Sequence, residues 1–155
     1  MTKAKPVKQK VIINRRAKYD YSIGDILVVG IELTGAETKS LRLGHGQLTG
    51  SYVTIKDNQL FLLNATINGT NSIRISESEQ TRTRKLLAKR REINKLIDIK
   101  NKGRTIIPLE ILTQGRYIKL KIAVAEGKKN YDKRETLKKR SAEKNIATQM
   151  KRRSL

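Results

Sequence analysis

The pattern of the sequence changes at Gly127, and this change constrains the fold more than any other feature. Before it, apolar side chains alternate with lysine or alanine at Ile118, Leu120, Ile122 and Val124, which predicts a strand with one buried face. After it, apolar residues are too sparse for a core, and eleven Lys or Arg accompany only three acidic residues. The sequence therefore predicts a folded β body followed by a basic tail.

Positive charge is concentrated at the two ends of the chain. Of the net charge of +21, residues 1–18 contribute +7 and residues 127–155 contribute +8, whereas residues 19–126 contribute only +6. Such a density of like charge opposes compaction and favours a polyanionic partner. Nucleic acid fits better than an anionic membrane, because no segment combines a strong apolar face with the basic residues and no apolar run approaches the ~20 residues of a membrane-spanning helix.

The body, residues 14–126, is expected to be mainly β. Short strands and turns favour an antiparallel barrel of the OB type. Asp57-Asn58 predicts a hairpin turn, and Pro108 predicts an edge or bulge position. The predicted strands cover residues 23–34, 51–56, 59–67, 104–112 and 118–125.

Two helices and one loop are expected between these strands. Residues 36–43 predict a short helix that Gly44 ends. Residues 83–99 predict one long helix, because apolar residues recur at helical spacing on one face. Residues 68–80 are polar and predict a loop, with a short strand at residues 73–75.

Both termini are expected to lie outside the barrel. Residues 1–13 predict a flexible basic arm, because Pro6 disfavours a helix and the lysines have no apolar face beside them. The tail, residues 127–155, is expected to be disordered in the free protein, since its cations repel one another along an isolated helix. On an anionic partner it is expected to become helical as counterions are released.

The residue types needed for catalysis or metal binding are scarce. The chain has no cysteine and one histidine, His45, which lies between two glycines in a predicted turn. Phosphate-binding loops of the GxxxxGK[ST] and GxGxxG kinds are absent. We therefore expect no enzyme, metal site, cofactor or small-molecule substrate. The lack of cysteine and of a signal peptide fits a cytoplasmic protein.

A basic segment with two aromatic residues, 14–21, precedes the first predicted strand. Guanidinium groups fork onto phosphates, and tyrosines stack on unpaired bases. The alternative is a solvated arm in which Tyr21 fills the core. The candidate RNA contacts of this segment are Asn14, Arg15, Arg16, Lys18 and Tyr19.

Two further groups of cations are candidates for RNA binding. Arg82, Arg84 and Lys85 at the start of the predicted long helix oppose its macrodipole, which bound phosphate would explain. Lys119 and Lys121 share a strand face with an aromatic residue, which suits RNA, although exposed strands also carry lysine for solubility.

Seven segments match one known family in its own order. They are NRRAKYDY (14–21), LTGAETKSLRLG (33–44), SYV (51–53), LFLLNATI (60–67), TRTRKLL (81–87), REINKL (91–96) and AEGKKNYDKRET (125–136). On these segments the chain resembles the small protein B family, the tmRNA-binding proteins of bacterial trans-translation. The resemblance implies an OB-like barrel with helices on its flank, which binds the tRNA-like domain of tmRNA and delivers it to ribosomes stalled without a stop codon. It also implies elongation factor Tu in the delivery complex, and a tail that folds in the vacant mRNA channel near the decoding centre.

The resemblance assigns roles to particular residues. It ties the start of the first segment and Leu87 to RNA binding, and the last segment adds Lys128 and Lys129. The tail residues expected in the mRNA channel are Tyr131, Asp132, Lys133, Arg134, Lys138, Lys139, Arg140 and Met150.

Three positions depart from the family pattern. Tyr19 stands where relatives typically have histidine, Val28 where they often have glutamate, and Gln149 where some have isoleucine. Tyrosine still stacks on a base but carries no positive charge, and Val28 removes one polar contact.

Composition alone leaves two other hypotheses. A structural ribosomal protein with basic extensions has the same charge distribution, but it would be present once per ribosome whether or not translation stalls. A duplex-DNA binder is the other hypothesis, although no helix-turn-helix spacing is evident.

Overall fold

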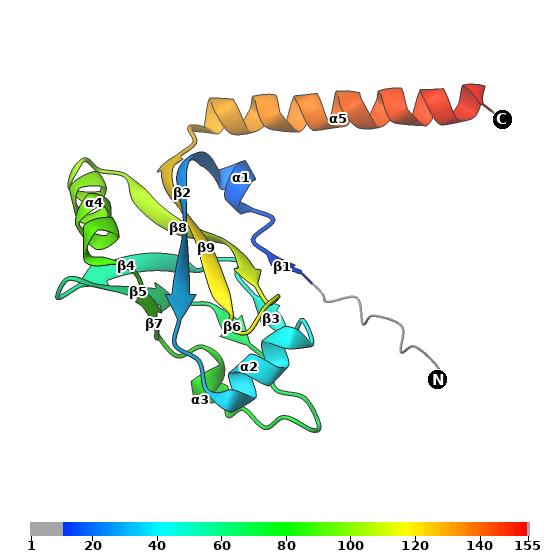
Figure 1. The fold of residues 1–155 in the computed structure, drawn as a ribbon. Helices are drawn as coiled ribbons and strands as arrows, with labels where there is room; N and C mark the ends of the chain where they lie inside the picture. Colours follow the sequence, from blue (N-terminus) through cyan, green and yellow to red (C-terminus); the bar gives the residue numbers. More distant parts are fainter. Residues whose placement is uncertain (1–10, 155) are drawn as a thin grey trace.

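The computed structural model describes residues 11–154, and their strands close into a barrel (Figure 1). The strands of the main sheet are β1 Ile12–Ile13, β2 Tyr21–Ile31, β4 Tyr52–Lys56, β5 Gln59–Leu63, β7 Arg84–Leu87, β8 Thr105–Leu112 and β9 Lys119–Gly127. They are antiparallel, in the order β1-β8-β4-β5-β7-β2-β9, and a further pairing of β8 with β9 closes the ring. The predicted antiparallel barrel is confirmed.

Helices and a second small sheet surround the barrel. β3 Gly46–Gln47 and β6 Thr66–Ile67 pair with each other. The helices are α1 Ala17–Asp20, α2 Gly35–Arg42, α3 Glu77–Gln80, α4 Arg90–Asn101 and α5 Asn130–Arg153. Figure 1 shows α2 and α3 at one end of the barrel and α1 at the other, next to the start of α5.

Alternate residues of the strands fill the barrel. Leu120, Ile122 and Val124 of β9 are buried, while Lys119 is exposed and Lys121 is half-buried. This is the alternation that the sequence predicts for the first half of β9, whereas in the second half Ala123 and Ala125 on the other face are buried as well. The same core contains Leu60, Leu62, Leu86, Ile106 and Ile111 from the other strands. Burial of each such side chain stabilises the fold by about 1.5–3 kcal/mol.

The predicted hairpin is formed by β4 and β5. Asp57 (φ 50°) and Asn58 (φ 57°) both have positive φ, which is the backbone of a type I′ turn and matches the twist of the flanking strands. The returning strand is shorter than predicted, because Asn64 also has a positive φ of 58°. That residue separates β5 from β6.

The prediction of one long helix over residues 83–99 is wrong. Residues 84–87 form β7, which pairs with β2 and β5, and the helix α4 begins only at Arg90. Leu86 falls at helical spacing from Ile93, which suggests a helix. Within residues 84–87, however, Arg84 and Leu86 are buried while Lys85 and Leu87 are more exposed, and this alternation is the period of a strand. Pairing on both sides decides in favour of the strand.

Two further boundaries differ from the prediction. No strand forms at residues 73–75 in the described chain, and the predicted loop contains the short helix α3. Ile12 and Ile13 pair with β8 as β1, and Ile12 is buried, so the barrel begins before residue 14. The rest of the predicted arm, with Lys3, Lys5, Lys8 and Lys10, lies outside the described residues except for Val11.

Pro108 lies at an irregularity of β8. The register with β9 shifts between Pro108 and Glu110, so the predicted bulge is confirmed. A proline has no N–H to donate to a ladder. The shift lets β8 pair with β9 on one side and with β1 and β4 on the other.

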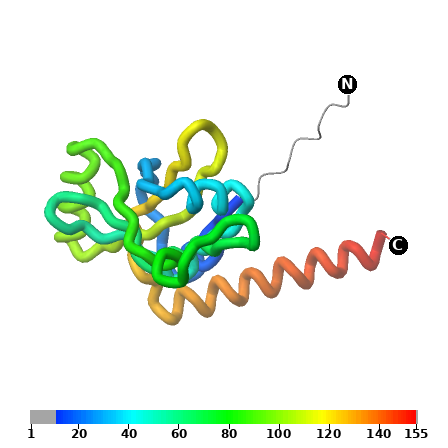
Figure 2. The backbone as a smooth tube through the Cα atoms, turned by 90° about the horizontal axis from the view of Figure 1, so that it is seen from below, coloured from blue at the N-terminus to red at the C-terminus, as the bar shows by residue number. Residues whose placement is uncertain are grey.

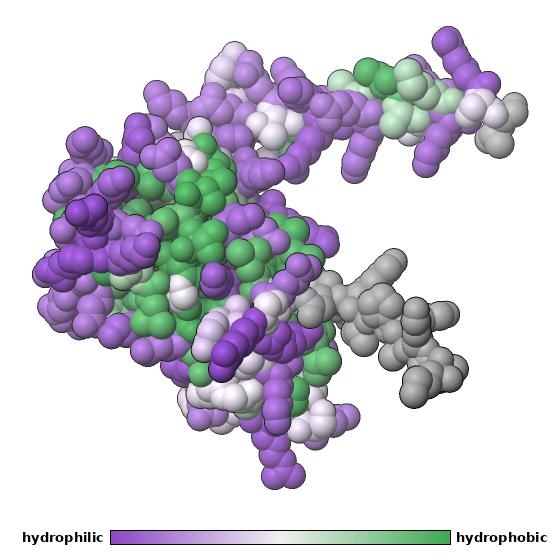
Figure 3. Space-filling view, in the orientation of Figure 1, coloured by the Kyte–Doolittle hydropathy of each residue, from purple (hydrophilic) through white to green (hydrophobic). Residues whose placement is uncertain are grey.

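The tail forms α5, a helix of 24 residues without a buried side chain. Figures 1 and 2 show it extending past the barrel, and Figure 3 shows its mainly hydrophilic surface with a small apolar area toward its far end. The disorder expected for the free tail stays a prediction.

The separation of body and tail predicts different sensitivities to mutation. Leu120→Ala removes a buried side chain of β9 and is expected to lower the free energy of unfolding by about 2–5 kcal/mol. Leu137→Ala, on exposed α5, is the matched control and is expected to change it by less than about 0.5 kcal/mol. Urea unfolding followed by far-ultraviolet circular dichroism measures both, and equal losses would mean that the tail packs on the barrel.

Candidate nucleic-acid interface

The first basic segment is anchored to the barrel by its one buried polar residue. Asn14 donates a side-chain hydrogen bond to the Pro108 carbonyl (3.0 Å), and its backbone N–H donates to the Leu109 carbonyl (2.7 Å). Asn14 Nδ2 is thus used inside the protein, whereas its Oδ1 is buried without a hydrogen-bond partner among the described residues. Asn14 anchors the segment, and its RNA contact stays a prediction.

The neighbours of Asn14 remain available to a partner. Ala17 packs in a small second core with Ile107 and Ala125, which fixes α1 against β8 and β9. Arg15, Arg16 and Lys18 are exposed, and Tyr19 is half-buried. The expected alternative of Tyr21 as a core residue also has support, because Tyr21 packs against the same small core.

Arg84 is fully buried and is the centre of an ionic network. All five of its N–H groups are used. Its Nε donates to Glu37 (3.0 Å), and its two terminal nitrogens donate to the carbonyls of Ala65, Glu79, Gln80 and Arg82 (2.9–3.0 Å). The predicted phosphate contact by Arg84 is therefore wrong, and so is the macrodipole argument for it, because residues 84–87 are a strand.

Glu37 supplies the countercharge of this network. Its carboxylate lies 2.7 Å from Arg82 and 2.9 Å from Arg84, and Thr34 forms a capping box with it at the start of α2. Burial acts to raise the pKa of Glu37, but the hydrogen bonds from Arg82 and Thr34 and the charge of Arg84 hold that pKa below its ordinary value. Arg82 is thus paired, with one third of its side chain exposed.

The outward residues of β7 lie on a continuous face with β2 and β9. Leu87 is opposite Gly30, and Gly30 is opposite Lys119, so these three positions share the outer face. A Cβ on Gly30 would lie 3.1 Å from the Leu87 Cβ, and the glycine therefore lets Leu87 pack close to β2. Leu87 is half-exposed and Lys119 is exposed.

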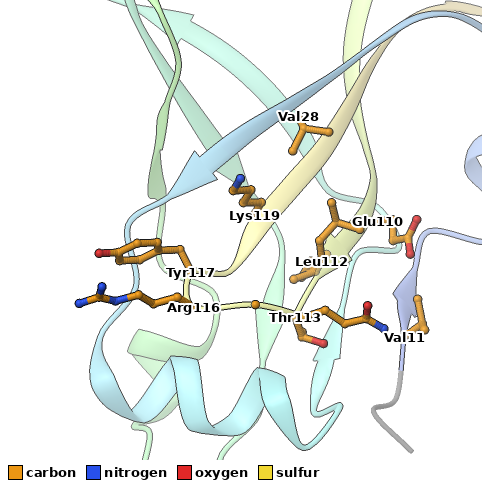
Figure 4. Close-up of a pocket in the computed structure, with 11 residues that line it drawn as sticks. Val11, Val28, Glu110, Leu112, Thr113, Arg116, Tyr117 and Lys119 are labelled. Carbon is orange, nitrogen blue, oxygen red and sulfur yellow. The ribbon is translucent and has the colours of Figure 1, made fainter.

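A hollow of about 490 Å³ adjoins this face. Figure 4 shows Val28 and Lys119 above it and Tyr117 beside Arg116 at one side. The Arg116 guanidinium lies 5.5 Å from the Tyr117 ring centroid, which is a cation–π distance. The lining is largely apolar, with Arg116 and Lys119 as cations and Glu110 as an anion that is paired with Lys121. The apolar lining and the two cations suit an RNA base with its phosphate.

The lysine opposite Val28 has an acidic partner on another strand. Val28 is directly opposite Lys121, so a carboxylate at position 28 would face that lysine. Here Lys121 Nζ lies 3.2 Å from Glu110 on β8. Lys121 is therefore paired within the protein, which leaves Lys119 as the freer cation of β9.

The basic residues at the start of the tail are divided between internal and exposed positions. Lys128 Nζ donates to the Lys18 carbonyl (2.9 Å), and Lys133 Nζ lies 3.5 Å from Asp20. Lys129 is exposed. The remaining tail candidates are all exposed: Tyr131, Asp132, Arg134, Lys138, Lys139, Arg140 and Met150.

Sequence reasoning missed two acidic residues, Glu37 and Asp20. The Thr-x-x-Glu spacing of the capping box at residues 34–37 is visible in the sequence, but its pairing with arginines from β7 is not. The spacing of Asp20 from Arg16 (i, i+4) is visible in the sequence, but its contact with Lys133 is not, because that partner comes from the other end of the chain.

Searches for two other kinds of site found none in the part of the chain that the structure describes. No helix there is long and apolar enough to cross a membrane. No group of three or more metal-binding side chains occurs within residues 11–154.

Comparison with known proteins identifies the family of the chain. The model of the family described as SmpB protein matches residues 11–152. The chain belongs to the SmpB family. An SsrA-binding protein of Caldicellulosiruptor bescii is 43% identical over 142 residues, which are 91% of this chain and 90% of that protein. The SsrA-binding protein of Acetivibrio thermocellus is 40% identical over 149 residues, covering 96% and 97%.

A solved structure shows the same SmpB fold. The structure described as "tmRNA-SmpB: a journey to the center of the bacterial ribosome" contains a chain that is 37% identical, with a TM-score of 0.63. The likeness covers 77% of this chain and 85% of the other. It agrees with the mainly antiparallel β fold and flanking helices of this SmpB-family member.

The ionic network predicts a large loss of stability in a Glu37→Gln variant. This change leaves Arg84 buried without its countercharge, which is expected to lower the free energy of unfolding by about 3–5 kcal/mol at neutral pH. Because folding lowers the pKa of Glu37, its contribution is complete above the ordinary value of 4.5 and is lost as the pH falls through the lower folded value.

Urea unfolding at pH 7 and at acidic pH tests this prediction. The difference between Glu37→Gln and the unaltered protein is expected to narrow in acid. The control is Asp25→Asn, which removes an exposed carboxylate of β2 and is expected to change stability little. A Glu37→Gln variant as stable as this control at pH 7 would show that the network is dispensable.

Proposed function

We propose that this chain is the tmRNA-binding adaptor of trans-translation in its cell. It binds the tRNA-like domain of tmRNA and brings it to ribosomes stalled on mRNA without a stop codon. The observation that carries this proposal is the outer face of β7, β2 and β9, where Leu87 lies across Gly30 from Lys119 in a member of the SmpB family. The protein acts as a binding adaptor and not as an enzyme.

The RNA-binding surface extends from α1 across this outer face. Arg15, Arg16 and Lys18 provide phosphate contacts beside Tyr19, which offers a face for stacking. Lys119 and Lys129 extend the cationic surface. Leu87 supplies apolar contact, and Lys85, half-buried on the same face, adds a cation. Arg82, Lys121 and Lys128 contribute through the exposed parts of side chains that are paired within the protein.

The tail takes the place of mRNA near the decoding centre in this proposal. Its exposed cations can contact small-subunit RNA along the whole helix, since none of its side chains is buried. Elongation factor Tu is a further proposed partner in the delivery complex. These partners act in the cytoplasm, which is the proposed location.

The alternative of a structural ribosomal protein is less well supported. Charge distribution fits both hypotheses, but membership of the SmpB family favours the adaptor. Sequencing of RNA that copurifies with the tagged protein distinguishes them. The adaptor enriches one tmRNA species, whereas a structural protein recovers ribosomal RNA at one copy per ribosome.

The division of labour between barrel and tail predicts separable losses. A protein ending at Lys129, which keeps Lys128 and Lys129 of the RNA-binding surface, is expected to bind tmRNA within about threefold of the full chain and to fail to support tagging of stalled peptides. Gel-shift titration and a tagging reaction on a stop-less mRNA measure the two properties. Loss of binding as severe as the loss of tagging would refute the division.

Salt dependence distinguishes cationic from apolar contacts on the outer face. Lys119→Gln is expected to weaken tmRNA binding and to reduce the slope of log K against log salt by roughly 0.7–0.9, the share of one phosphate contact. Leu87→Ser is expected to weaken binding without changing that slope. The control Lys56→Gln removes an equal charge at the exposed end of β4 and is expected to leave both properties unchanged.

A further inference from the structure

The start of α5 is held against α1 by contacts that RNA binding does not explain. The Asp20 carboxylate lies 3.5 Å from Lys133 Nζ and 3.7 Å from Arg16 Nε. The Asp20 carbonyl accepts a hydrogen bond from the Lys128 N–H (3.0 Å). Lys133 Nζ also lies 5.9 Å from the centroid of the Tyr19 ring. One residue, Asp20, thus contacts both the basic segment and the tail.

The backbone contacts fix the end of β9, whereas the side-chain contacts of Lys133 fix the start of α5. β2 and β9 pair as far as Tyr21 and Gly127, and the backbone hydrogen bond from Lys128 continues that pairing by one residue. Neither sets the direction of a helix that begins at Asn130. Lys133 lies within the first turn of α5, so its contacts with Asp20 and Tyr19 are the ones that limit rotation of the helix relative to the barrel.

We propose that Asp20 is the positioning residue of the tail and that Tyr19 assists it. Together they hold Lys133 and set the direction in which α5 leaves the barrel. The face of a tyrosine ring attracts an ammonium group, whereas a protonated histidine at this position would repel it. The departure of Tyr19 from the family pattern therefore suits this contact.

Asp20 also connects the tail to the RNA-binding segment, a consequence that rests on the proposed function. Arg16 and Lys133 share one carboxylate, and the side chain of Arg16 is 65% exposed while that of Lys133 is 31% exposed. When a phosphate binds Arg16, Arg16 no longer pairs with Asp20, and the Asp20 carboxylate then pairs with Lys133 only. RNA binding then strengthens the hold on the tail, and by linkage the held tail favours RNA binding. Because exposed ion pairs are weak, this coupling is expected to be only a few-fold.

Distance measurement between barrel and tail tests the proposal in the full-length protein. The chain has no cysteine, so Lys95→Cys on α4 and Ala147→Cys on α5 give a unique pair of exposed sites for spin labels. Pulsed electron paramagnetic resonance then reports the distribution of distances. Asp20→Asn is expected to broaden it, and Tyr19→Leu is expected to broaden it less. The matched control Asp25→Asn is expected to leave it unchanged.

A double mutant separates positioning from a general loss of structure. Lys133→Met removes the contacts with both Asp20 and Tyr19 from the tail side, where no barrel residue is altered. The distance distribution of the double variant Asp20→Asn with Lys133→Met is expected to be no broader than that of Lys133→Met alone, with the melting temperature of the barrel unchanged in all three variants. An unchanged distribution in Asp20→Asn, or additive broadening in the double variant, would overturn the proposal.

Addition of an RNA with a tRNA-like fold tests the coupling separately. Narrowing of the distance distribution in the unaltered protein, and a loss of that narrowing in Asp20→Asn, would support it. If the RNA binds and the distribution stays the same, the coupling is wrong. If the RNA does not bind in a titration, the proposed function fails, while the measurements without RNA still decide the role of Asp20.

Discussion

The arrangement of the barrel surface depends on the burial of Arg84. Moving a guanidinium group out of water costs several kcal/mol unless its charge and its donors are matched. Here Glu37 matches the charge, and the carbonyls of Ala65, Glu79, Gln80 and Arg82 accept the remaining hydrogen bonds. The same side chain therefore joins α2, the connection between β5 and β6, and α3 to β7. A lysine could not replace it, because only the planar fork reaches so many acceptors at once.

The outer face follows from this inward anchor. A strand directs successive side chains to opposite sides, so the inward positions of Arg84 and Leu86 turn Lys85 and Leu87 outward. Pairing through β2 then aligns Leu87 with Lys119. The segment at residues 81–87, which the family resemblance connects with RNA, thus has two kinds of residue. Arg84 and Leu86 anchor the strand in the barrel, and Lys85 and Leu87 face outward, where RNA can contact them.

Local patterns predicted the parts of this protein that depend on neighbours in sequence. The alternation in β9, the Asp57-Asn58 turn, the short helix before Gly44 and the change at Gly127 could all be read directly. The helix predicted over residues 83–99 failed because Leu86 has the spacing of a helix, while its two strand partners are distant in sequence. The same reason hid the burial of Arg84, since its countercharge lies 47 residues earlier. The anchoring role of Asn14 was missed because the sequence does not show that Pro108 lies beside it.

The length of α5 turns small events at its base into large displacements at its tip. A helix of 24 residues is about 36 Å long. A tilt of only about 10° at the first turn therefore sweeps the far end through roughly 6 Å, more than one helical pitch. The position of the distal end of such a helix follows the geometry of its first turn. Under the proposed positioning role, Asp20 and Tyr19 therefore set where the far end of α5 lies.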